Sequence, residues 1–166
     1  NKAEEDRTIV VVSALGGITD ILLQCSKMAA AGDEAYKEKL HEAELRHLNT
    51  VKELITITQQ SAVLSMVKTL CNELEDICNG IFLLKELSER TKDRMVSYGE
   101  VLSSKIIAAK LNTEGIVCEW KNSRDLIITN SNFGAADVNF ATTNANISSY
   151  FSSSESNIFM MPGFIA

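Results

Sequence analysis

Residues 7–14 read RTIVVVSA, and the glycine pair Gly16-Gly17 follows almost at once. A continuous, β-branched apolar run of this length predicts a strand that is buried on both faces, as in a parallel sheet covered by helices. After the glycines, apolar residues recur at helical spacing from Ile18 to Met28. The stretch therefore predicts a strand, a glycine turn and a helix, which is the local unit of an α/β fold.

The next segments predict a long helical hairpin. Residues 33–60 and 61–87 each carry an apolar stripe within a polar helical pattern, and we expect them to pack as two antiparallel helices. Gly80, inside the second helix, costs roughly 1 kcal/mol relative to alanine and indicates a bend or a close contact with a neighbouring helix. A third helix is predicted over residues 91–111.

Strand signals return after these helices. The remaining elements predicted from local pattern are short strands at 116–120, 126–129 and 157–165, a turn at 130–134 and a helix at 138–151. Strands separated by helices favour an α/β fold with a mostly parallel sheet. A chain of 166 residues is long enough for one domain with its own core.

Composition excludes several classes of function. The net charge is -6 and no cluster of Lys and Arg is present, so no nucleic-acid partner is expected. The longest apolar run, at residues 9–12, is far shorter than the ~20 residues of a membrane span, so no membrane partner is expected either. The four cysteines form no C-x-x-C pair, which favours reduced thiols in a cytoplasmic protein.

Two patterns that resemble reactive sites fail on spacing. Cys71 and Cys78 lie about 10 Å apart along one predicted helix, too far for a disulfide, and are expected to be core or half-buried residues. His41 begins a sequence similar to the zinc motif H-E-x-x-H, but Leu45 stands where the second histidine is required, and His47 points elsewhere. We expect no metal site.

Three short motifs carry possible chemistry. Residues 13–19, SALGGIT, form a strand end and a glycine turn that open a helix, where free backbone N–H groups favour anions, although turn geometry alone also explains the glycines. Gly99 precedes Glu100 inside a predicted helix, which indicates close approach of another group to the backbone. Phe164 follows a proline-glycine strand exit and is otherwise a core aromatic residue.

In chain order, VVVSALGGITD (10–20), VSYGEVLSSKIIAAKL (96–111), NSNFGAA (130–136) and MPGFIA (161–166) closely resemble the successive motifs of the aspartate kinase family. The resemblance covers nearly the whole chain, including the helical hairpin at about 33–88. It implies the three-layer α/β/α sandwich of the amino-acid kinases and phosphorylation of the L-aspartate β-carboxylate by ATP and Mg²⁺, the first step towards lysine, threonine and methionine.

Matching motif positions imply no catalytic residue within the chain. They imply five substrate-binding residues: Ser13, Ala14, Thr19, Glu100 and Phe164. Ser13, Ala14 and Thr19 are expected to line the aspartate pocket. Glu100 is expected to contact the substrate's α-amino end, and Phe164 to close part of the site.

The chain departs from the family at both ends. The family's opening lysine-phenylalanine-glycine-glycine-threonine-serine segment and its glycine-arginine-glycine-glycine-serine-aspartate loop have no counterpart in residues 1–166. We therefore expect a central fragment of one catalytic domain, inactive alone, with an exposed sheet edge that favours a homo-oligomer. Whether the complete protein also carries regulatory ACT domains or a fused homoserine dehydrogenase is left open.

Two alternatives also stay open. One is another amino-acid kinase, acting on glutamate, acetylglutamate or a nucleoside phosphate, although the long hairpin argues against it. The other is a non-catalytic helical interaction module, in which residues 13–19 form only a turn and the hairpin binds a partner protein.

Overall fold

The structure, a computed structural model, describes residues 7–163. Phe164 lies outside this range. The elements in chain order are β1 (Thr8–Val12), α1 (Ile18–Ala30), α2 (Tyr36–Leu54), the 3-10 turn η1 (Ile57–Gln59), α3 (Gln60–Leu84), α4 (Glu89–Thr113), β2 (Glu119–Trp120), the 3-10 turn η2 (Ser123–Asp125), α5 (Phe140–Ser153) and β3 (Ile158–Pro162).

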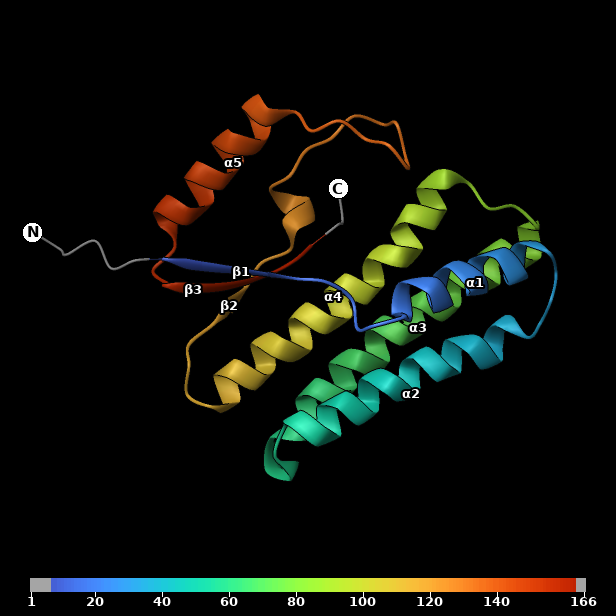
Figure 1. Ribbon diagram of the computed structural model, residues 1–166, viewed down its shortest axis with the longest axis horizontal. Helices are drawn as coiled ribbons and strands as arrows, with labels where there is room; N and C mark the ends of the chain where they lie inside the picture. The colour runs from blue at the N-terminus through green and yellow to red at the C-terminus, as the bar shows by residue number, and fades with distance from the viewer. Residues whose placement is uncertain (1–6, 164–166) are drawn as a thin grey trace, which may run out of the picture.

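The described strands form one parallel sheet in the order β1-β3-β2 (Figure 1). Val10 pairs with Met160, and the side chains of both pack towards Ala108 of α4. On the opposite face, Phe151 of α5 meets Phe159 of β3 edge to face, with ring centroids 4.7 Å apart. The sheet therefore lies between helices on both faces, which confirms the predicted α/β fold with a parallel sheet.

The first four helices form a bundle beside the sheet. The antiparallel hairpin of α2 and α3 packs against α1 and α4, as Figure 1 shows. Its core includes Leu22, Leu74 and Met95, each no more than 1% exposed. The predicted hairpin is confirmed, and Cys71 and Cys78 are buried in this core as expected.

Several local predictions were wrong. The strand at 7–14 was expected to be buried on both faces, but Ile9 and Val11 are about half exposed, because β1 is an edge strand of the described sheet. Of the strand expected at 116–120, only Glu119–Trp120 pairs with β3.

Residues 126–129 form no strand, because the N–H groups of Leu126 and Ile127 both bond to the Ser123 carbonyl and are unavailable to a sheet. Of the two explanations expected for Gly80, the close helix contact is wrong, because a Cβ added there would meet no atom within 4 Å, and the bend stays a prediction.

The sheet is less completely covered than the bundle. Ile9 is 47% exposed and Val11 is 62% exposed, although both belong to β1. β1 is also an edge strand of the described sheet. The expected exposed edge and apolar face are therefore present. Within residues 7–163, no helix is both long enough and apolar enough to span a membrane.

Candidate functional site

The carboxyl ends of β1 and β3 meet at one edge of the sheet. Ser13 and Ala14 follow β1, and Gly163 follows β3. The Gly163 N–H donates to the Val12 carbonyl at 2.9 Å, which joins the two strand ends. Open α/β sheets bind their ligands at such an edge. Ser13, Ala14, Glu100 and Gly163 together are called the strand-end site below.

Helix α4 reaches this edge through Gly99. A Cβ added at Gly99 would lie 2.9 Å from Cβ of Ala14 and 3.2 Å from Cγ2 of Ile18. Both distances are shorter than an ordinary van der Waals contact, so only glycine lets α4 pass this close to the turn and to α1. The close approach predicted from the glycine before Glu100 is confirmed.

That approach brings the Glu100 carboxylate to the strand ends. Glu100 is 7% exposed, and its Oε2 atom has no hydrogen-bond partner among the described residues. Oε2 lies 3.6 Å from the position of a Cβ added at Gly163. Burial raises the pKa of Glu100, and a backbone hydrogen bond from Ala14 opposes part of that rise.

A buried carboxylate oxygen without a partner is costly and therefore calls for an explanation. A carboxylate only accepts hydrogen bonds, so an ammonium or a hydroxyl group of a ligand would satisfy it. Gly163 brings only backbone next to Oε2, because a Cβ there would lie 3.3 Å from Cγ1 of Val11 and 3.4 Å from the Val12 carbonyl oxygen.

The turn between β1 and α1 is held at two points. The Ser103 hydroxyl of α4 donates to the Ser13 carbonyl at 2.6 Å, and Nη2 of Arg46 donates to the Gly16 carbonyl at 2.6 Å. Ser13 is exposed, and Thr19 is half-buried in the first turn of α1. The structure thus places Ser13, Ala14 and Glu100 around one strand edge, with Thr19 one helical turn away.

Comparison with known proteins finds homologues of one kind. No family profile matches the chain. The chain is 34% identical to the chloroplastic aspartokinase 1 of Arabidopsis thaliana over 142 residues, which cover 83% of this chain and 24% of that protein. It is 27% identical to a chloroplastic bifunctional aspartokinase/homoserine dehydrogenase 1 of the same plant, over 99% of this chain and 18% of that protein. The chain is a homologue of the aspartokinases.

Solved structures agree on the fold. The aspartokinase III of E. coli, crystallised with lysine and aspartate, superposes with a TM-score of 0.82 at 20% identity. The match covers 92% of this chain and 33% of that one. A second structure of that protein, with aspartate and ADP, gives the same TM-score. The chain therefore spans about a third or less of the aspartokinases that it resembles.

A groove of about 980 Å³ adjoins the strand-end site of this aspartokinase homologue at Gly163. Its apolar wall includes Ile9, Val11 and Met161 of the sheet, and three arginines also line it: Arg90, Arg94 and Arg124. Cζ of Arg90 lies 5.8 Å from the centroid of the Phe133 ring. Residues 133–136 also line the groove, and the Gly134 N–H donates to Asp93 at 2.7 Å. The sequence did not predict this groove.

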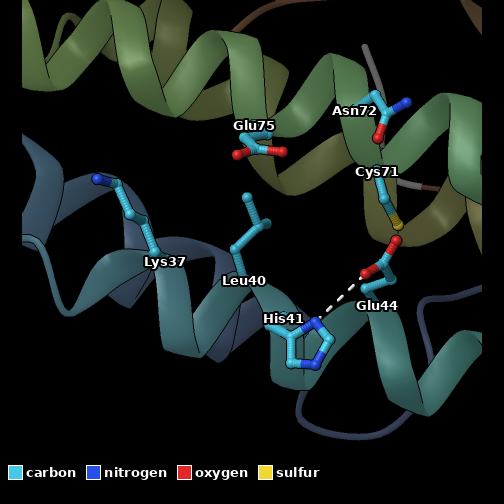
Figure 2. Close-up of a pocket in the computed structure, with 7 residues that line it drawn as sticks. All are labelled: Lys37, Leu40, His41, Glu44, Cys71, Asn72 and Glu75. Atoms are coloured by element: carbon cyan, nitrogen blue, oxygen red, sulfur yellow. Dashed lines mark hydrogen bonds and ion pairs between the residues drawn. The ribbon is translucent and has the colours of Figure 1, made fainter.

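A second, smaller hollow of about 140 Å³ lies between α2 and α3 (Figure 2). Glu44 there accepts from His41 at 3.3 Å and pairs with Lys68 at 2.7 Å. No three or more His, Cys, Asp or Glu side chains within residues 7–163 are placed to hold a metal ion. His47 is fully buried and directs Nδ1 at the Ala43 carbonyl, so the two imidazoles lie on different faces, as predicted.

Sequence reasoning missed Ser103 and Arg46. Ser103 lies three residues after Glu100, on the same side of α4, so helical spacing alone points it at the same site. Arg46 lies within the hairpin, 30 residues from the carbonyl that it binds, and no local pattern links the two.

Proposed function

We propose that this chain forms the aspartate-binding part of the catalytic domain of an aspartate kinase, which transfers the γ-phosphoryl group of ATP to the β-carboxylate of L-aspartate. One observation carries the proposal. The buried, partnerless carboxylate oxygen of Glu100 stands where Ala14 and Gly163 end two parallel strands. The homology to aspartokinases over most of the chain supports the same substrate.

Each residue of the site has a role in this proposal. Glu100 accepts hydrogen bonds from the α-ammonium group of aspartate, because its pKa is raised by burial and a cation would relieve that cost. The N–H groups at the start of α1, with the hydroxyls of Ser13 and Thr19, bind a carboxylate. Phe164 closes part of the pocket. The chain's contribution is to position the substrate.

The described residues do not fit ATP and Mg²⁺. They hold no acidic cluster for a cation and no glycine-rich loop followed by a lysine for phosphates. We therefore propose that the nucleotide and the metal are held by other segments of the enzyme, and that residues 1–166 alone do not turn over. Phosphoryl transfer depends on neutralising charge, so the loss of those segments removes activity.

The test uses the complete protein that carries this chain. We expect ADP formation in a coupled assay to require L-aspartate, and glutamate to be a far poorer substrate. Residues 1–166 alone should give no turnover. Equal rates with glutamate would favour another amino-acid kinase, and no turnover by the complete protein with any amino acid would favour the helical interaction module.

We also propose a homo-oligomeric protein in the cytoplasm. The exposed Ile9 and Val11 on an edge strand support self-association. The four free cysteines are compatible with a reducing compartment, which the cytoplasm and the chloroplast stroma share. The plant relatives are named chloroplastic, so fluorescence microscopy of the tagged complete protein is the deciding measurement.

A further inference from the structure

One cationic side chain of the helical hairpin reaches the turn that borders the strand-end site. Nη2 of Arg46, on α2, donates to the Gly16 carbonyl at 2.6 Å. Nη1 of the same guanidinium lies 3.6 Å from the position of a Cβ added at Gly17. The hydrogen bond links α2 to the turn that joins β1 to α1.

This turn has little local support. Gly17 is the N-cap of α1, has φ 79°, and makes no side-chain capping bond, as expected for glycine. The Ile18 N–H reaches the Leu15 carbonyl at 2.9 Å within the turn. Among the side-chain bonds of the described chain, those from Arg46 and Ser103 fix the two ends of the turn.

The bond to Gly16 has a directional consequence. The peptide that joins Gly16 to Gly17 is planar and trans, so its N–H points away from its carbonyl. A guanidinium that holds the carbonyl on the α2 side therefore directs the Gly17 N–H to the opposite side. It also polarises the peptide, which makes that N–H a better donor to an anion.

The Arg46 cation also lies close to the N-terminus of α1, where the helix dipole disfavours a positive charge. The N-terminus of a helix carries partial positive charge, so the Arg46 cation adds to the positive charge at the start of α1, which Asp20 in the first turn offsets only in part. A bound carboxylate at this helix start would offset both positive charges. The backbone of Arg46 is fixed within α2, where Thr50 donates to its carbonyl at 2.9 Å and the neighbouring His47 is fully buried, while the Arg46 side chain itself is exposed.

We propose that Arg46 is a positioning residue for the substrate, which orients the Gly16-Gly17 peptide towards the aspartate carboxylate and so couples the hairpin to the site. The proposal rests on the proposed aspartate kinase function. Arg46 acts through the turn and is not a catalytic residue.

The test compares Arg46→Ala, Arg46→Lys and Lys52→Ala in the complete protein. Lys52 is an exposed cation on the same helix with no side-chain hydrogen bond or ion pair in the described structure, so its variant is the matched control. Removing one charge-assisted hydrogen bond from a binding turn should raise the KM for aspartate about five- to tenfold in Arg46→Ala. The KM for ATP and the melting temperature should match those of Lys52→Ala, and Arg46→Lys should recover part of the loss.

Hydrogen exchange of the peptide that covers residues 13–19 gives a readout without activity. Exchange should be faster in Arg46→Ala than in Lys52→Ala. If both variants show the same KM for aspartate and the same exchange, the proposal is overturned. A uniform loss of kcat and stability would also overturn it, because that pattern is structural. If the unaltered protein does not phosphorylate aspartate, the proposed function fails, while the exchange result still decides whether Arg46 holds the turn.

Discussion

The helical bundle and the sheet of this chain bury their apolar side chains to different degrees. In the bundle, Leu22 and Leu74 are at most 1% exposed, whereas in the sheet Ile9 and Val11 are about half exposed. The strand-end site lies where the two regions meet, with Glu100 supplied by α4 of the bundle and Gly163 by the sheet. The core of the bundle is therefore closely packed, whereas the edge strand β1 of the described sheet leaves apolar side chains exposed.

The largest expected effect comes from the bundle core. Leu74→Ala should lower the free energy of unfolding by about 2–5 kcal/mol, because it removes buried methyl groups and leaves a cavity. Val11→Ala, in the exposed part of the sheet, should cost less than about 1 kcal/mol. Urea denaturation followed by circular dichroism measures both. Equal losses would contradict the contrast between the two regions.

The next prediction tests the contact between the bundle and the sheet. Gly99→Ala places a methyl group 2.9 Å from Cβ of Ala14, which should cost about 1–3 kcal/mol through overpacking and should weaken aspartate binding. Gly80→Ala is the control in a neighbouring helix. It meets no atom within 4 Å and should stabilise the protein by roughly 1 kcal/mol. Thermal melts of the two variants should shift in opposite directions.

A third prediction separates stability from binding at Glu100. Burial raises the pKa of Glu100 in the folded state above 4.5, so its ionisation lowers stability as the pH rises through the folded-state pKa. Glu100→Gln removes that loss, and at pH 7 it should be at least as stable as the unaltered protein. The variant should nevertheless raise the KM for aspartate about tenfold or more.

Glu53→Gln is the control for that variant, because Glu53 is an exposed carboxylate on α2. It should leave both the KM and the pH dependence unchanged. An unchanged KM for aspartate in Glu100→Gln would remove Glu100 from the site.

The smallest effect concerns His47 in the bundle. Burial lowers the pKa of His47 below its ordinary value of 6.5, so the unfolded chain takes up the proton first as the pH falls. Stability should therefore decline below about pH 6.5 until the folded-state pKa is reached. In His47→Gln this part of the decline should disappear, whereas the exposed His41→Gln should keep it. Urea midpoints between pH 5 and 8 make the comparison.

The spacing of apolar residues along the sequence predicted the elements whose formation depends on nearby residues. The apolar run before Gly16 became β1, and the two apolar stripes became the hairpin α2–α3. The strand predicted at residues 126–129 was wrong. The β-branched composition of these residues is typical of a strand, but their first two N–H groups donate to the Ser123 carbonyl in a turn. Strand propensity alone does not determine which carbonyl a backbone N–H group donates to.

The candidate site was predictable only in part. Gly99 before Glu100 indicated a close approach, but the sequence did not say that Ala14 would be the neighbour. Arg46 and Ser103 act across 30 and 90 residues of chain, and such contacts exist only once the helices have packed. The expected substrate contacts of Ser13, Ala14, Thr19, Glu100 and Phe164 stay predictions.

The pairing of β1 with β3 also bears on how the chain acquires its structure. Thr8 pairs with Ile158, so nearly the whole chain separates the two partners of the sheet's longest ladder. Contacts between distant segments form slowly, because the entropy of closing a long loop must be overcome first. During synthesis the helices α1–α4 can therefore fold while β1 still lacks a partner. We therefore expect the sheet, and with it the strand-end site, to form after the helices.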